Sequence, residues 1–272
     1  MATSKASVPL LSYVLHRYDW SETSLIVELF TRAQGRVVVI AKGAKRPTSQ
    51  LRPVLLPFQP LHAMLGKTPA DTESEIHLLR SAEWTGGQPL LAAAAMFSGF
   101  YLNELLMKLL ARQDPHPALF DAYADTLAAL ATEPDEAAAL RAFELVLLRE
   151  LGWLPELNTV TLTAESLLPE QHYTLQAEAG IVPAAKGPRG RAWVALEAAL
   201  GHGKTQGNPQ GSPQGSPQCS TAALRALCAS EAAALRVPLR TLLHYHLGPA
   251  PLRTRQVWQG VQRLAQTAPD RR

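Results

Sequence analysis

Short apolar or alternating runs dominate the first 84 residues, and residues rich in Gly, Pro, Asp and Ser separate them. Runs of about four to eight such residues between turn residues are typical of β-strands. Five strands are predicted, over residues 10–16, 24–30, 35–43, 61–65 and 74–84. No helical pattern interrupts them, so a small antiparallel barrel or sandwich is expected, and an OB-like barrel is the commonest such fold that binds nucleic acid.

The periodicity changes at 86–89, after which apolar residues recur at helical spacing. Pro89 suits the first turn of a helix, and the Asp-Pro-His-Pro sequence that starts at Asp114 ends that helix. Two further helices are predicted over 118–131 and 134–152. Three amphipathic helices in succession indicate a helical bundle.

The second half of the chain mixes an ambiguous segment, a low-complexity segment and more helix. Two stretches, 158–168 and 172–182, could be short strands or loops. At about 201–220 lie three tandem Gly-x-Pro-Gln units without apolar side chains, which predict a disordered insertion because nothing there offsets the entropy of ordering. Helical patterns resume over 221–236, 238–248 and 251–266.

These elements predict an α+β protein, with an N-terminal OB-fold β-barrel followed by a mainly α-helical domain. The expected domains are 1–85 and 86–272. The chain has 272 residues, of which 47% are apolar, so two modest domains could each bury a core. Two cysteines, Cys219 and Cys228, exclude a disulfide scaffold and suit a reducing compartment.

Charge is distributed unevenly along the chain. Residues 1–70 carry nine Lys or Arg against three acids, residues 71–185 carry five against seventeen, and residues 186–272 carry twelve against three. The net charge is only +3, but a basic head and a basic tail suggest a polyanionic partner. The N-terminus lacks the apolar core of a signal peptide, and no run reaches the roughly 18 to 20 apolar residues of a membrane helix. We therefore expect a cytoplasmic protein that does not span a membrane.

Motifs for nucleotide binding, metal binding and catalysis are either incomplete or absent. Two Gly-Lys-Thr triplets, at 66–68 and 203–205, lack the upstream glycine of a phosphate-binding loop. The two cysteines are nine residues apart without a second pair, and His244 and His246 would face different sides of a helix. No nucleophile motif is present. No catalytic residue, metal or cofactor is expected, and the protein is not expected to be an enzyme.

One basic stretch remains as the candidate site. No Asp or Glu occurs from Phe30 through Ala70, while seven Lys or Arg do. Cations near phosphates release condensed counterions, which gives affinity for nucleic acid of any sequence. The predicted contacts are Arg36, Lys42, Lys45, Arg46 and Arg52, with Lys42 and Arg46 the strongest choices. Five aromatic residues could stack on bases, although most are expected in the core: Tyr13, Tyr18, Trp20, Phe30 and Phe58. From these residues alone, binding to a protein or to a membrane surface stays open.

A family resemblance accompanies this stretch. Its parts are Ser21-Glu22-Thr23, Thr31, Gly35-Arg36, Ala41-Lys42-Gly43 with Arg46, and Pro57-Phe58-x-Pro60-Leu61. In this order they resemble the N-terminal domain of the RecO family, bacterial DNA repair and recombination mediators. Residues 100–130, 140–157 and 242–256 resemble the helical domain of that family.

The resemblance implies an OB-fold, a helical domain and a function in DNA repair and recombination. It implies binding to single- and double-stranded DNA, annealing of complementary strands, and loading of RecA with RecR onto strands coated by single-stranded-DNA-binding protein in double-strand break and gap repair. The expected location is the cytoplasm, in association with the nucleoid. Arg240, Arg253 and Arg255 could extend the DNA path or receive the acidic C-terminal tail of single-stranded-DNA-binding protein.

One departure and one alternative accompany the resemblance. Many family members carry two Cys-x-x-Cys pairs after the segment that corresponds to 151–157, but Asn158, Thr159 and Val160 follow here, so no zinc site is expected. The alternative to a DNA-binding mediator is a basic scaffold that docks acidic partner peptides.

Overall fold

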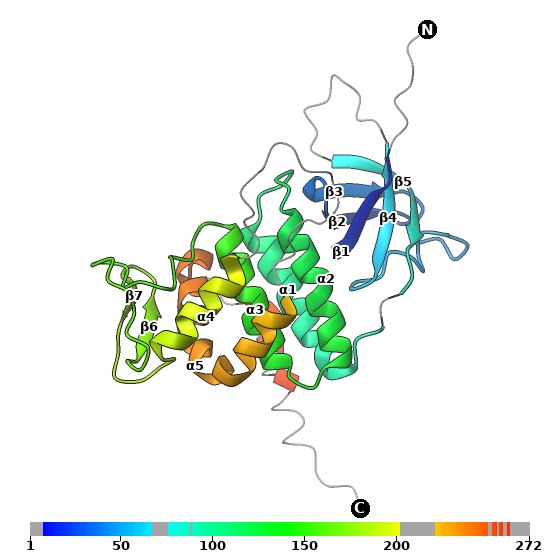
Figure 1. Cartoon of the computed structure of the whole chain (residues 1–272). Helices are drawn as coiled ribbons and strands as arrows, with labels where there is room; N and C mark the ends of the chain where they lie inside the picture. The colour runs from blue at the N-terminus through cyan, green and yellow to red at the C-terminus, as the bar shows by residue number, and fades with distance from the viewer. Residues whose placement is uncertain are drawn as a thin grey trace, which may run out of the picture. The chain divides into compact units, whose positions relative to one another are not determined.

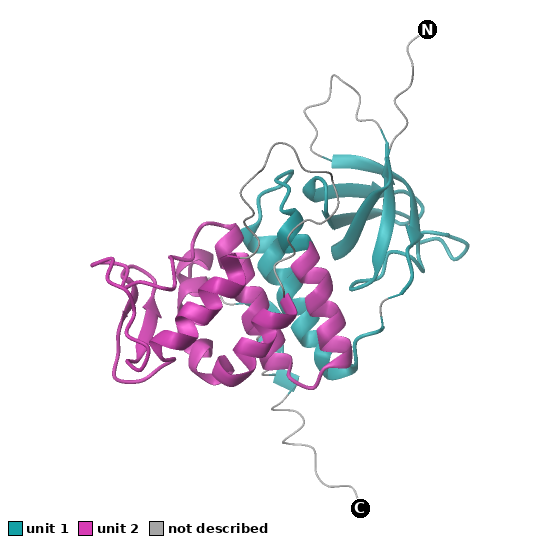
Figure 2. Cartoon of the chain, in the orientation of Figure 1, with its two compact units in different colours: residues 1–120, 251–272 teal, residues 121–250 magenta. Residues whose placement is uncertain are grey.

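The computed structural model describes residues 8–66, 76–87, 89–201 and 221–249, and part of 252–261. The predicted insertion at 201–220 lies outside the described residues apart from Gly201, as do most of both Gly-Lys-Thr triplets. Two compact units divide the chain, residues 1–120 with 251–272 and residues 121–250 (Figure 2). The helix that follows the barrel therefore shares a unit with it, whereas the sequence placed a boundary at 85.

Five strands form a closed barrel in the first unit (Figure 1). They are β1 (Leu10–Asp19), β2 (Leu25–Thr31), β3 (Gly35–Ala41), β4 (Pro60–Leu65) and β5 (Ile76–Trp84). The strand order is β1-β2-β3-β5-β4, and β4 closes the barrel on β1. Alternation fills the interior with residues such as Val27, Leu29, Val37 and Val39. The predicted OB-like barrel and the α+β class are confirmed.

Helix α1 (Ala93–Leu109) belongs to the same unit as the barrel. It begins four residues after Pro89, which the sequence had placed in its first turn. The buried Asn103 fixes α1 to β1, since its amide nitrogen donates to the Leu15 carbonyl at 3.0 Å. The Phe120 ring lies 5.4 Å from that of Tyr13 and 5.3 Å from that of Phe30. These contacts hold the helical connection against the outside of the barrel.

The remaining helices are α2 (Pro117–Thr132), α3 (Glu136–Glu150), α4 (Gly190–Gly201) and α5 (Thr221–Leu247). Helix α3 starts as predicted, because the Asp135 carboxylate accepts from the Ala138 N–H at 2.9 Å. It ends at Glu150, and Gly152, two residues later, has a φ of 72° that suits glycine. Two helices were predicted around Pro238, but α5 runs through that proline as one helix.

The ambiguous segment after α3 contains a hairpin and a helix. Strands β6 (Tyr173–Gln176) and β7 (Gly180–Pro183) pair, and α4 follows. The fully buried Trp193 anchors α4. Glu197 accepts from Arg149 at 2.5 Å and from the Leu157 N–H at 2.8 Å. Packing and this ion pair thus hold the segment, which contains no cysteine.

Candidate nucleic-acid interface

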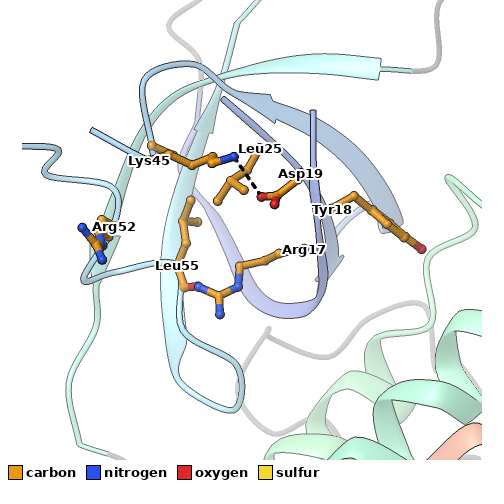
Figure 3. Close-up of a pocket in the computed structure, with 8 residues that line it drawn as sticks. Arg17, Tyr18, Asp19, Leu25, Lys45, Arg52 and Leu55 are labelled. Atoms are coloured by element: carbon orange, nitrogen blue, oxygen red, sulfur yellow. Dashed lines mark hydrogen bonds and ion pairs between the residues drawn. The ribbon is translucent and has the colours of Figure 1, made fainter. Parts of the chain in front are cut away.

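A groove of about 700 Å³ opens at one end of the barrel (Figure 3). Strands β1 and β2 supply one side, and the loop between β3 and β4 supplies the other. The lining residues are Arg17, Tyr18, Asp19, Leu25, Ala44, Lys45, Arg52 and Leu55. Three of the eight are cations and one is an acid, so the groove carries net positive charge.

Hydrogen bonds fix two of the groove cations in place. The Lys45 amine lies 3.3 Å from the Asp19 carboxylate and donates to the Ser21 carbonyl at 3.1 Å. The Arg17 guanidinium donates to the Leu55 carbonyl at 3.0 Å. Both cations keep further N–H donors, because an ammonium has three and a guanidinium five. The groove therefore presents two cations in fixed positions.

The loop that follows β3 is built by a tight turn. The sequence predicted strand as far as Gly43, but β3 ends at Ala41 and Gly43 has a φ of 72°. The Lys45 N–H donates to the Thr23 carbonyl at 2.9 Å, which ties the turn to the β1–β2 connection. Lys42, Arg46 and Arg52 are exposed. Four of the five predicted contacts thus lie on one loop, two of them in the groove.

Arg36, the fifth predicted contact, lies in a different environment. Its side chain is 13% exposed, its guanidinium donates to the Met107 carbonyl, and its Nε lies 3.7 Å from the Glu28 carboxylate. Glu28 is itself 4% exposed and accepts from Arg112 at 3.1 Å. One buried carboxylate therefore holds an arginine from β3 and an arginine from the connection between α1 and α2.

Gly35 explains why a Gly-Arg pair is needed here. Its φ is 66°, and a Cβ at this position would lie 1.9 Å from the Asp114 carbonyl oxygen. The Gln113 N–H also donates to the Arg36 carbonyl at 2.9 Å. The pair lets the α1–α2 connection lie directly on the β2–β3 hairpin. We call the contacts of Glu28, Gly35, Arg36 and Arg112 the barrel–helix joint.

Comparison with known proteins fits this architecture. "Recombination protein O N terminal" matches residues 11–87 and "Recombination protein O C terminal" matches residues 92–200. The chain is 49% identical to DNA repair protein RecO of Polaromonas naphthalenivorans over 259 residues, which cover 93% of this chain and 96% of that protein. It is 46% identical to DNA repair protein RecO of Verminephrobacter eiseniae over 270 residues, with 97% and 100% covered.

The chain belongs to the RecO family. The protein therefore has a role in DNA repair, in agreement with the resemblance found in its sequence. Among its described residues, no helix is long and apolar enough to span a membrane.

Two of the three tail arginines belong to the described residues, one in each compact unit. Arg240 is exposed on α5, Arg253 is exposed in the unit of the barrel, and Arg255 lies outside the described residues. Glu104 of α1 holds the segment of Arg253: it accepts from the Arg253 N–H at 2.8 Å, from the Thr254 N–H at 3.0 Å and from the Thr254 hydroxyl at 2.7 Å. Lys108 lies 3.3 Å from the same carboxylate.

This contact predicts a pH dependence. Burial raises the pKa of Glu104, but the hydrogen bonds from Thr254, Arg253 and Lys108 outweigh it and hold the pKa below its ordinary value of 4.5. The contact should stabilise the segment above pH 4.5 and weaken as the pH falls through the lowered pKa. We expect the NMR amide shifts of Arg253 and Thr254 to titrate with a midpoint below 4.5, and Glu104→Ala to abolish that titration. A midpoint at or above 4.5 would contradict the assignment of this titration to Glu104. The control is Glu83→Ala, which removes an exposed carboxylate of β5 and should leave the titration unchanged.

Sequence reasoning missed Arg17, whereas its expectation that most of the five aromatic residues lie in the core is confirmed. Tyr13, Phe30 and Phe58 are buried as expected, whereas Tyr18 and Trp20 are 43% and 63% exposed. The sequence carried a signal, since the apolar run Tyr13–Leu15 gives way to the polar residues His16, Arg17 and Asp19. In the structure, residues 16–20 are five consecutive exposed positions after four buried ones. A strand segment without a buried face no longer packs in the core.

The chemistry of the buried thiol offers no second site. Cys228 is buried, and burial raises the pKa of its thiol to about 12, so it stays protonated at neutral pH. Among the described residues, no three His, Cys, Asp or Glu side chains gather as a metal site.

Proposed function

We propose that this protein is a non-enzymatic mediator that binds single- and double-stranded DNA through the loop after β3 and the groove at the barrel end. The observation that carries the proposal is the gathering of Arg17, Lys45 and Arg52 around one groove, with Lys42 and Arg46 exposed on the same loop. Asp19 is the single acid of the groove lining, and Lys45 pairs with it.

Such a surface favours the DNA backbone over the base edges. Lysine and arginine contacts to phosphates displace counterions and carry no sequence information. A strand that follows the loop could contact Lys42, Lys45, Arg46, Arg52 and Arg17. We assign Arg36 to the barrel–helix joint instead, because Met107 and Glu28 occupy its guanidinium.

Annealing follows from the same charge. Two DNA strands repel each other as polyanions, and a basic surface that neutralises both lowers this barrier to pairing. By analogy with its family, we propose that the protein anneals complementary strands and acts with RecR to load RecA onto strands coated by single-stranded-DNA-binding protein. Arg240, Arg253 and Arg255 are candidates for further DNA contact or for the acidic tail of that coating protein.

The test is a titration of fluorescently labelled single-stranded DNA at several salt concentrations. Four to five phosphate contacts should give a slope of log affinity against log salt of about −3 to −3.5. The same titration in the presence of an acidic peptide distinguishes the mediator from a peptide-docking scaffold. Weak binding to DNA with a flat salt dependence, combined with tight binding of the peptide, would overturn the proposal in favour of the scaffold.

A further inference from the structure

Asp19 is the one carboxylate among the described residues that line the groove. It is the last residue of β1, where it pairs with Leu25 of β2. Its carboxylate lies 3.3 Å from the Lys45 amine, and Figure 3 shows the two side chains extended toward each other. An acid therefore lies directly beside a cation of the proposed DNA site.

The position of the Lys45 amine does not depend on this ion pair. The amine also donates to the Ser21 carbonyl at 3.1 Å, and the Lys45 backbone N–H donates to the Thr23 carbonyl at 2.9 Å. Both acceptors belong to the β1–β2 connection, so the loop after β3 keeps these two bonds without the carboxylate. Ion pairs on a protein surface contribute little to stability, and the Asp19 side chain is 79% exposed. Stability therefore does not explain the acid at this position.

The carboxylate lies where an incoming anion would meet it. The Lys45 side chain is only 33% exposed, so Asp19 forms the more exposed side of the pair. A phosphate that reaches the amine from solvent must come close to the carboxylate as well. Two like charges about 5 Å apart repel each other enough to weaken binding about fourfold in water, and more where protein lowers the dielectric constant.

We propose that Asp19 limits the affinity of the groove for DNA and speeds the release of bound strands. The carboxylate holds the Lys45 amine while the groove is empty, and it competes with a phosphate for that amine when DNA binds. This inference rests on the proposed function and adds to it a residue that weakens the contact. Affinity differences among variants of one interface arise mainly from dissociation rates. We therefore assign the effect of Asp19 to the dissociation step.

Rapid release suits a surface that anneals strands. The groove and the loop after β3 would bind backbone, which single strands and duplexes share, so the same cations hold the strands that enter and the duplex that forms. Too high an affinity would keep the duplex on the protein. One acid among the groove cations lowers the affinity without removing a contact.

Asp19→Asn tests the proposal, because it removes the charge, keeps the size of the side chain and still offers Lys45 a carbonyl oxygen. The variant should bind single-stranded and duplex DNA about fourfold more tightly at low salt, with most of the gain in slower dissociation. The gain should shrink as salt screens the repulsion. Fluorescence titration measures the affinity, and stopped-flow chase with unlabelled DNA measures the dissociation rate. The matched control is Glu22→Gln, which neutralises an exposed acid of the β1–β2 connection outside the groove lining and should bind DNA as the wild type does.

A double-mutant cycle with Lys45→Ala separates competition for one amine from a general effect of charge. Asp19→Asn should lose most of its gain in the Lys45→Ala background, because the two side chains act as a pair. An equal gain in both backgrounds would overturn the proposal. So would an Asp19→Asn variant with wild-type or lower affinity, and either result would leave backbone binding by the wild type intact. If the wild-type protein binds neither form of DNA, the proposed function fails and this inference fails with it.

Discussion

Replacing Glu28 with alanine is expected to lower the free energy of unfolding by about 3 kcal/mol. The substitution leaves Arg36, which is 13% exposed, without its carboxylate partner and removes the acceptor of the Arg112 hydrogen bond. The value lies at the low end for a broken buried ion pair because the Arg112 side chain is 41% exposed. In a chain of this size, the melting temperature should fall by roughly 6–12 °C.

The comparison variant for this prediction is Glu22→Ala, which removes an exposed acid between β1 and β2. Thermal unfolding followed by circular dichroism measures both variants. A double-mutant cycle with Arg112→Ala should be non-additive, since the two side chains contact each other. If Glu28→Ala and Glu22→Ala have the same melting temperature, the barrel–helix joint does not contribute the stability assigned to it.

The joint also shows what the sequence could and could not predict about the site. The Gly-Arg pair was recognisable as a motif, and the acid-free stretch around it made Arg36 a reasonable DNA contact. Its partners Met107 and Glu28 lie 71 residues ahead and 8 residues behind, on other elements. Only the closed barrel and its packing on α1 bring them together. The loop cations needed no such long-range contact, which is why Lys42 and Arg46 could be predicted to be exposed.

The same contrast between local pattern and long-range contact applies to the elements of the fold. The five strands could be predicted from alternation because one face of each packs in a single core. Helix α4 was missed although Trp193, Leu196 and Leu200 recur at helical spacing, because the strand-like stretches before it gave no clear boundary. Pro238 indicated a break, yet α5 continues through it, with Leu235, Leu239 and Leu242 buried on both sides.

Lys42 and Arg46 carry the second large expected effect, on DNA affinity. Both are exposed on the loop after β3, so their loss should not disturb the core. If each contacts one phosphate, the Lys42→Ala, Arg46→Ala double variant loses two contacts. The affinity for single-stranded DNA should then fall by about tenfold to thirtyfold at low salt, and the salt slope should become shallower by about 1.4.

A charge-matched control is available in the other compact unit. Lys186→Ala with Arg236→Ala also removes two exposed cations, so the net charge of the whole chain changes equally. This control should keep wild-type affinity and slope, because the proposed effect depends on the position of the charges. Equal weakening in both double variants would mean that DNA responds to overall charge alone.

The salt-dependent titration of the Lys42/Arg46 double variant is therefore the most direct test of a DNA backbone site at the end of the barrel. Lower affinity with a shallower slope, beside an unchanged control, is the result expected. Wild-type affinity with a wild-type slope would contradict the site.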